Sequence, residues 1–170
     1  DEAYHYFYPK TFIKYAFNSK HILVTRTFSK LFSMAGCRLG YVVGHPDEIK
    51  MVQKLCTPHN TNAFAMLIAE KILEAPGILT YLNYNLGRDY LVKELDTHGY
   101  LHKGDAGNFI FIKPKTDAVS IVDKMKSEKQ ILIKSYSNVG NFGTCLRVTI
   151  GARQYMERFL DALFELDNIN

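Results

Sequence analysis

The residues of this chain that could carry out chemistry gather in one stretch, residues 25–40. Lys30 follows the hydroxyl residues Thr27 and Ser29, and Arg38 comes eight residues later, after a glycine-containing turn. An amine becomes nucleophilic only when it loses its proton, which burial and cationic neighbours favour. Two hydroxyls and a guanidinium offer several hydrogen-bond donors to a phosphate. The pattern therefore predicts a reactive amine held beside a bound phosphate.

A carboxylate and a phenol stand at the start of the chain, Asp1 and Tyr4, just under thirty residues before Lys30. Pyridoxal phosphate needs a carboxylate against its ring nitrogen, which keeps the ring protonated as an electron sink, and a hydrogen-bonding partner for its ring hydroxyl. Asp1 and Tyr4 are suited to these roles, and Lys30 is suited to holding the cofactor aldehyde. The sequence predicts a pyridoxal-phosphate site with Lys30, Asp1 and Tyr4 as catalytic residues and Thr27, Ser29 and Arg38 around the phosphate.

At these positions the chain resembles the fold-type I pyridoxal-phosphate aminotransferases of class I and II, and within them the histidinol-phosphate aminotransferase-like branch. Four motifs follow one another as in that family: Asp-Glu-Ala-Tyr at 1–4, Thr-Phe-Ser-Lys at 27–30, Ala-Gly-x-Arg-x-Gly at 35–40 and Leu-Arg-Val-Thr at 146–149. The resemblance covers nearly the whole chain and implies the C-terminal portion of such an enzyme. The family's N-terminal half, which supplies further cofactor contacts, is not among these residues.

The resemblance implies transamination between an amino donor and a 2-oxo acid acceptor, in amino-acid biosynthesis, by a cytoplasmic enzyme that is a homodimer as a whole. Lys30 would also move the substrate Cα proton as general acid and base. In the family, the arginine of the fourth motif grips the substrate α-carboxylate through two hydrogen bonds, so Arg147 is expected in that role. Lys134 stands where histidinol-phosphate aminotransferases usually carry an arginine that helps to hold the distal phosphate. A lysine keeps the positive charge but cannot donate the two parallel hydrogen bonds of an arginine. Histidinol phosphate is therefore one candidate donor among phosphorylated or polar amino compounds.

Three other interpretations stay open. A decarboxylase or α-oxoamine synthase of the same fold would share Asp1, Lys30 and Arg38. An aminotransferase-like effector domain of a transcription regulator would bind the cofactor without turnover, and a purely structural fragment would bind no ligand. Because the family's N-terminal half is needed to complete the cofactor site, the 170 residues alone are expected to bind pyridoxal phosphate weakly and to be inactive.

Composition narrows the classes of partner. The chain is 47% hydrophobic, which indicates a globular protein with a sizeable core. Its formal net charge is +4 with scattered lysines, so no basic block marks a nucleic-acid footprint. No apolar run approaches the roughly 18 residues of a membrane span. Three widely spaced cysteines indicate neither a disulfide framework nor a zinc site, and His98 and His102 are separated by Gly99, which argues against a shared metal.

Hydrophobic periodicity predicts an α/β fold for the first part of the chain. Residues 21–25 are expected to form a buried parallel strand and residues 38–43 a second strand. A helix is expected over 47–55, and a mostly buried helix, capped by residues 60–62, is expected to run to Glu74 and to end at 76–77. A further helix is expected to reach about residue 98, with an apolar stripe made of Leu79, Leu82, Leu86 and Tyr90.

Glycines cluster between residues 99 and 107, which places the expected domain boundary there. Residues 1–98 are expected to be the second half of a large pyridoxal-phosphate-binding domain, a mostly parallel sheet with helices. Residues 99–170 are expected to be a small α+β C-terminal domain. Its predicted elements are strands at 108–113, 130–134 and 146–150 and helices at 116–127 and 152–166.

Overall fold

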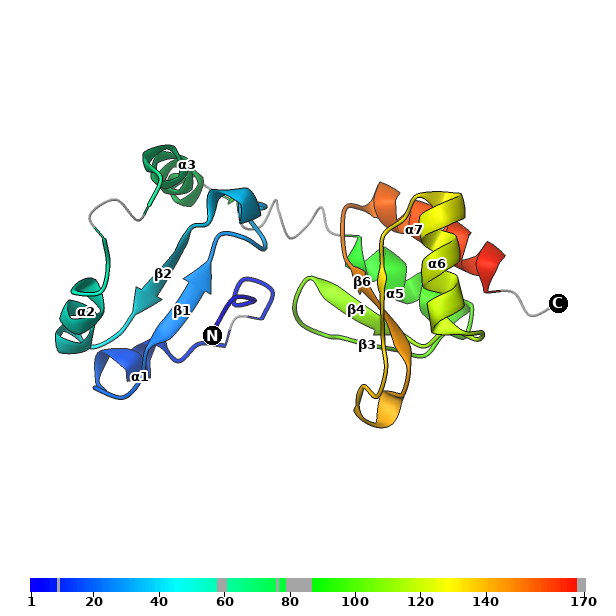
Figure 1. Cartoon of the computed structure of the whole chain (residues 1–170), viewed down its shortest axis with the longest axis horizontal. Helices are drawn as coiled ribbons and strands as arrows, with labels where there is room; N and C mark the ends of the chain where they lie inside the picture. The colour runs from blue at the N-terminus through cyan, green and yellow to red at the C-terminus, as the bar shows by residue number, and fades with distance from the viewer. Residues whose placement is uncertain (9, 58–60, 76, 79–86, 168–170) are drawn as a thin grey trace. The chain divides into compact units, whose positions relative to one another are not determined.

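The computed structural model describes residues 1–8, 10–57, 61–75, 77–78 and 87–167, and it divides the chain into two compact units, Asp1–Asn83 and Tyr84–Asn170 (Figure 1). Each unit combines helices and strands around its own hydrophobic cluster, so the predicted α/β class is confirmed. Among the described residues, no helix combines the length and the apolar character that crossing a membrane requires.

The first unit is built on a two-stranded sheet. Strand β1 (Val24–Thr27) pairs with β2 (Gly40–Val43), and Thr27 lies opposite Gly40. The pairing is antiparallel, whereas residues 21–25 were expected to form a parallel strand. Parallel neighbours need a crossover that usually contains an α-helix, and residues 28–39 contain only the short 3₁₀ helix η1 (Ala35–Cys37). Helices α1 (Ile13–Phe17), α2 (Pro46–Gln53) and α3 (Ala63–Glu74) complete the unit.

Helix α3 begins where the cap residues predict. The side-chain oxygen of Asn62 accepts hydrogen bonds from the amides of Phe64 and Ala65 at 2.9 and 3.1 Å. The prediction that this helix is mostly buried is wrong, because Phe64 is 77% exposed and only Ala65 and Ala69 of the helix are buried. Periodicity shows which side chains share a helix face, but it does not show whether another element covers that face.

The second unit is a four-stranded antiparallel sheet with strand order β3-β4-β6-β5. The observed order β4, α6, β5, β6, α7 confirms the predicted strand–helix–strand–strand–helix sequence, and β3 is an additional short strand. The strand expected at 130–134 begins only at Lys134. The elements are α5 (Arg88–Thr97), β3 (His102–Lys103), β4 (Phe109–Ile112), α6 (Ala118–Lys129), β5 (Lys134–Tyr136), η2 (Gly140–Phe142), β6 (Cys145–Thr149) and α7 (Arg153–Leu166).

Helices α5, α6 and α7 pack on one face of this sheet (Figure 1). Strand β4 alternates between buried Ile110 and Ile112, which join the helices in the core, and half-buried Phe109 and Phe111 on the opposite face. The apolar stripe predicted for α7 is buried as expected: Met156, Phe159, Leu160 and Leu163. The face without helices is thus left to carry polar and aromatic side chains.

The division between the compact units falls earlier than the predicted domain boundary. Helix α5 packs on α7, and its Leu91 and Leu95 are fully buried in the second core, whereas the expected boundary assigns α5 to the first domain. Gly99, Gly104 and Gly107 have positive φ, so these glycines make turns within the second unit. The predictions for residues 79–86, for Pro76 and for Asn60 of the expected cap lie outside the described residues.

Candidate functional site

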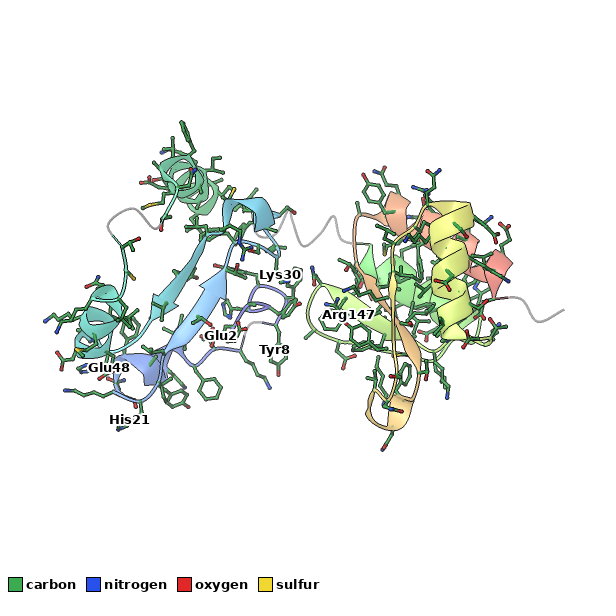
Figure 2. The ribbon with its side chains drawn as sticks, in the orientation of Figure 1. Glu2, Tyr8, His21, Lys30, Glu48 and Arg147 are labelled. Carbon is green, nitrogen blue, oxygen red and sulfur yellow. The ribbon has the colours of Figure 1, made fainter. Side chains whose placement is uncertain are left out.

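Lys30 follows the carboxyl end of β1, whereas His21 precedes the other end of that strand (Figure 2). The loop that carries Lys30 is tight, because the Ser33 amide donates to the Lys30 carbonyl oxygen at 3.0 Å and the Met34 amide to Phe28 at 3.1 Å. Buried Phe28, Leu31, Phe32 and Met34 hold this loop against the unit. The Lys30 ammonium lies 5.5 Å from the centre of the Tyr4 ring, so the structure brings together two of the predicted catalytic residues.

The segment with Asp1 and Tyr4 runs beside β1. The Glu2 amide donates to the Thr25 carbonyl oxygen at 2.8 Å, and the Asp1 carboxylate accepts a hydrogen bond from the Ala3 amide at 2.9 Å. Asp1 and Tyr4 line a pocket of about 390 Å³ together with His5 and Tyr8. Asp1 therefore lies on the same segment as the tyrosine that meets Lys30.

The predicted phosphate-binding residues stand where β1 and β2 leave their pairing. The Phe28 amide donates to the Leu39 carbonyl oxygen at 3.1 Å, which keeps the chain after β1 close to the chain before β2. Arg38 is exposed and has φ +52°, a left-handed conformation that is uncommon for a large side chain and is concentrated at functional sites. Its guanidinium donates to the Ala35 carbonyl oxygen at 3.0 Å, and no carboxylate of a described residue lies within ion-pair distance.

The Thr27 and Ser29 hydroxyls differ in their surroundings. The Thr27 hydroxyl accepts a hydrogen bond from the Ser29 amide at 3.0 Å and donates to the Leu39 carbonyl oxygen at 3.4 Å. Thr27 therefore helps to shape the turn before Lys30. The assignment of Thr27, Ser29 and Arg38 to a phosphate stays a prediction.

The structure also contains a hydrogen-bonded ion pair between Glu2 and Arg26 that the sequence did not predict. The Glu2 carboxylate accepts two hydrogen bonds from Arg26, at 2.9 and 3.1 Å, one from the Thr11 hydroxyl at 3.0 Å and one from the Phe12 amide at 2.7 Å. Burial works against ionisation of Glu2, but these hydrogen bonds and the Arg26 charge outweigh it, so the pKa of Glu2 is lowered. The signal in the sequence was a glutamate inside the first motif, next to Asp1, and an arginine directly before the second motif, next to Thr27.

Arg147 and Lys134, the two predicted substrate-binding residues, are directly opposite each other on β6 and β5. The Arg147 guanidinium also lies 4.1 Å from the centre of the Phe109 ring. Like charges placed opposite each other on a sheet repel, and no described carboxylate lies within ion-pair distance of either cation. The face of the sheet without helices therefore presents an uncompensated pair of cations, which favours an anionic ligand.

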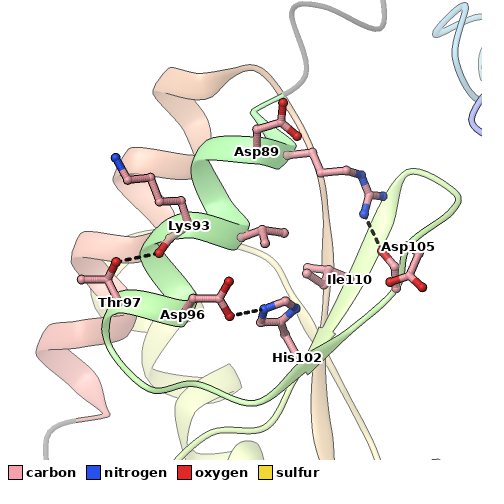
Figure 3. A pocket seen from close by; sticks show the side chains of 10 residues that line it. Asp89, Lys93, Asp96, Thr97, His102, Asp105 and Ile110 are labelled. Carbon is pink, nitrogen blue, oxygen red and sulfur yellow. Dashed lines mark hydrogen bonds and ion pairs between the residues drawn. The ribbon is translucent and has the colours of Figure 1, made fainter.

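The two histidines considered for a metal have separate protein partners. The His102 Nε2 donates a hydrogen bond to the Asp96 carboxylate at 2.9 Å, and the His98 ring stacks on Phe164 with centroids 3.9 Å apart. His102 lines a pocket of about 540 Å³ between α5 and the loop that contains Asp105 (Figure 3). Within the described ranges, no three histidine, cysteine, aspartate or glutamate side chains are arranged to hold a metal ion.

Comparison with known proteins identifies the family. Residues 1–163 match the family described as aminotransferase class I and II. The chain belongs to this family. Among curated members it is 32% identical, over 98% of its length, to a histidinol-phosphate aminotransferase of Caldanaerobacter subterraneus subsp. tengcongensis, of which it covers 47%. The chain thus spans about half the length of the curated aminotransferases it matches.

Solved structures agree with the aminotransferase fold. A histidinol-phosphate aminotransferase from Sinorhizobium meliloti in complex with pyridoxal-5'-phosphate superposes with a TM-score of 0.86 at 23% identity, covering 98% of this chain and 47% of that one. L-threonine-O-3-phosphate decarboxylase from Porphyromonas gingivalis superposes with a TM-score of 0.73 at 23% identity, covering 97% and 53%. At these identities the likeness shows the fold that the aminotransferase family shares.

Proposed function

We propose that this chain is part of a pyridoxal-phosphate-dependent aminotransferase, which transfers an amino group between an amino acid or amino phosphate and a 2-oxo acid. The observation that carries the proposal is the Lys30 amine over the Tyr4 ring at 5.5 Å, on a chain that belongs to the aminotransferase class I and II family. Asp1, on the same segment as Tyr4, supplies the carboxylate that the cofactor requires.

The residues present fit pyridoxal phosphate. When bound, the cofactor supplies an electron sink for the charge that develops at the substrate Cα. Lys30 holds the cofactor covalently and moves the Cα proton, since its amine stands at the end of β1 beside the Tyr4 ring. Asp1 hydrogen-bonds the ring nitrogen and Tyr4 the ring hydroxyl. Thr27, Ser29 and Arg38 bind the phosphate, and Thr27 also shapes the turn that carries Ser29.

Arg147 and Lys134 are proposed to bind the substrate. The Arg147 guanidinium can donate two parallel hydrogen bonds to the α-carboxylate, and its contact with the Phe109 ring at 4.1 Å restrains it. Lys134, opposite Arg147, offers a second positive charge to a substrate with another anionic group. Histidinol phosphate is the proposed donor, which the names of the curated relatives support, although a lysine contacts a phosphate without a fork.

The proposal extends to the whole protein. Because the chain spans about half of its curated relatives, we propose that a longer protein carries the activity, as a cytoplasmic homodimer whose ligands are small molecules. The 170 residues alone are proposed to be inactive. Decarboxylation is the second candidate, because a decarboxylase shares the fold. Product analysis separates the two reactions, since transamination yields a keto acid and decarboxylation releases carbon dioxide.

The decisive experiment removes the amine. In full-length protein reconstituted with pyridoxal phosphate, Lys30→Ala is expected to abolish the visible absorbance band of the covalently held cofactor. Lys14→Ala is the matched control, because the Lys14 ammonium also lies over a tyrosine ring, that of Tyr15, at 4.9 Å. An unchanged band in Lys30→Ala would show that another residue holds the cofactor and would contradict the proposal.

A further inference from the structure

The segment that carries Asp1 and Tyr4 consists of turns, without a helix or strand of its own among residues 1–8. Among the backbone hydrogen bonds of the described residues, one, from the Glu2 amide to the Thr25 carbonyl oxygen, joins its start to β1. A catalytic carboxylate has to be held to a fraction of an ångström, and one backbone bond leaves rotation about the segment free. The side chains of the segment must therefore provide the remaining restraint.

Glu2 and Arg26 provide most of this restraint. Both Arg26 Nε and Nη2 donate to the same oxygen of Glu2, at 3.1 and 2.9 Å, and Nη2 also donates to the Thr11 hydroxyl at 3.0 Å. The side chains of Arg26 and Glu2 are only 10% and 12% exposed, so water screens the pair weakly. Arg26 lies on β1, the strand that leads into the Lys30 loop, so the ion pair connects the two halves of the proposed cofactor site.

A second group of contacts holds the segment at Tyr6, two residues after Tyr4. Arg26 Nη1 donates to the Tyr41 hydroxyl on β2 at 3.4 Å, and the Tyr41 and Tyr6 hydroxyls are 3.2 Å apart. The Tyr6 ring packs edge-on against Phe32 with centroids 4.9 Å apart. Burial and the hydrogen bond to Tyr41 raise the pKa of Tyr6 to about 12, so this phenol stays protonated at neutral pH. Glu2 and Tyr6 thus flank Tyr4, and both connect to Arg26.

We propose that Arg26 is a positioning residue, which holds Glu2 by hydrogen bonds and Tyr6 both through Tyr41 and by its guanidinium, 6.0 Å from the centre of the Tyr6 ring. Arg26 thereby sets where Asp1 and Tyr4 stand relative to Lys30. The ligand in this proposal rests on the proposed function, whereas the contacts of Arg26 with Glu2 and Tyr41 are observed in the structure. Arg26 and Glu2 use their donors and acceptors on each other and on Thr11, Phe12 and Tyr41, so they act on the cofactor only through the residues they hold.

The test uses Arg26→Met, the milder Arg26→Lys, which keeps the charge but loses the fork, and Glu2→Gln, which keeps the side-chain shape. The control is Asp47→Asn, because it removes the exposed ion pair with Lys20 at 2.8 Å in the same unit. The first measurement is amide hydrogen exchange in the full-length protein without cofactor. The Glu2, Phe7 and Tyr8 amides are expected to exchange about tenfold faster in Arg26→Met, as the loss of a charge-assisted hydrogen bond implies, while β1 and β2 keep their protection.

The second measurement is the visible absorbance of the cofactor-loaded protein against pH. If Asp1 moves away from the ring nitrogen, the pH midpoint of the absorbance change shifts by about half a unit or more, and the dissociation constant of pyridoxal phosphate rises about tenfold. We expect both changes in Arg26→Met and Glu2→Gln, smaller ones in Arg26→Lys and none in Asp47→Asn. A residue that only stabilised the fold would lower the melting temperature without moving the pH midpoint.

The two measurements test different parts of the proposal. Unchanged amide exchange at Glu2, Phe7 and Tyr8 in Arg26→Met would show that Arg26 does not hold the segment. Faster exchange with an unchanged pH midpoint would show that Arg26 holds the segment but does not position Asp1. If the wild-type protein binds no pyridoxal phosphate, the proposed function fails and the positioning role fails with it, while the exchange measurement still decides whether Arg26 holds the segment.

Discussion

At the scale of one residue, the packing around Gly40 explains why the Ala-Gly-x-Arg-x-Gly motif at residues 35–40 ends in glycine. A Cβ atom at Gly40 would lie 2.8 Å from the carbonyl oxygen of Arg26 across the β1–β2 pair, closer than real contacts allow. The first glycine of the same motif, Gly36, has no neighbour within 4 Å of the equivalent position. Only the second glycine is therefore required by the packing of the strands.

We expect Gly40→Ala to destabilise the protein by about 1–3 kcal/mol, because the backbone of β1 must shift to admit the methyl group. Gly36→Ala is the control and is expected to change stability by less than about 1 kcal/mol. Urea denaturation followed by circular dichroism measures both. Equal effects of the two substitutions would contradict the close approach of Gly40 to β1.

The Glu2 carboxylate predicts a dependence of stability on pH. Its pKa is lowered from the ordinary value of 4.5 in the folded protein, so its contribution is complete above that value and is lost as the pH falls through the folded pKa. The difference in unfolding free energy between wild type and Glu2→Gln is therefore expected to be largest near neutral pH and to shrink below pH 4.5. Denaturant titrations at a series of pH values measure it, and a difference that grew in acid would contradict the lowered pKa.

At the scale of elements, Asp167 at the end of α7 fastens the connection between β4 and α6. This carboxylate is fully buried and accepts hydrogen bonds from the amides of Lys115 and Thr116 at 2.8 and 2.7 Å and from the Thr116 hydroxyl at 2.6 Å. Burial and a hydrogen bond to Asp167 also raise the pKa of Tyr100. One side chain therefore satisfies several donors on a turn far away in the sequence.

We expect Asp167→Asn to lower the free energy of unfolding by about 2–4 kcal/mol. The asparagine NH₂ group cannot accept a hydrogen bond, so one of the buried N–H groups of Lys115 and Thr116 would lose its acceptor. Asp161→Asn, at an exposed position of the same helix, is expected to have an effect within about 0.5 kcal/mol. Thermal unfolding of the two variants gives the comparison. If Asp167→Asn were as stable as Asp161→Asn, the anchoring role of this carboxylate would be refuted.

At the scale of the whole molecule, the residues proposed to bind the cofactor and those proposed to bind the substrate belong to different compact units. The proposed cofactor-binding residues around Lys30 lie in the first unit, and Arg147 and Lys134 lie in the second. Helix α3 leaves large apolar side chains such as Phe64 and Leu67 exposed. Exposed apolar patches of this kind often mark contact surfaces. Because the chain spans about half the length of its curated relatives, we propose that a longer protein carries the activity.

We therefore expect the 170-residue chain alone to bind pyridoxal phosphate at least about a hundredfold more weakly than the full-length protein, which corresponds to losing about 2.7 kcal/mol of binding energy. Fluorescence titration of both proteins with the cofactor measures this difference. The variant Lys30→Ala of each protein corrects for cofactor held by other amines. Tight stoichiometric binding by the chain alone would refute the expectation.

The sequence by itself determined the family, the order of elements in the second unit and the order of the proposed site residues. These follow from local patterns: residue types at set spacings, the period of the α7 stripe, and the Asn62 cap that begins α3. The resemblance assigned Lys134 and Arg147 to the substrate, but that the two residues lie opposite each other on β5 and β6 was not predicted.

Only the tertiary structure decided what covers each face and which distant residues meet. The exposure of α3, the antiparallel pairing of β1 with β2 and the packing of α5 in the second unit depend on neighbours that no single element encodes. The grip of Arg26 on Glu2 likewise joins residues 24 positions apart. Local spacing constrains the backbone of one segment, whereas burial and long-range hydrogen bonds arise only when segments assemble.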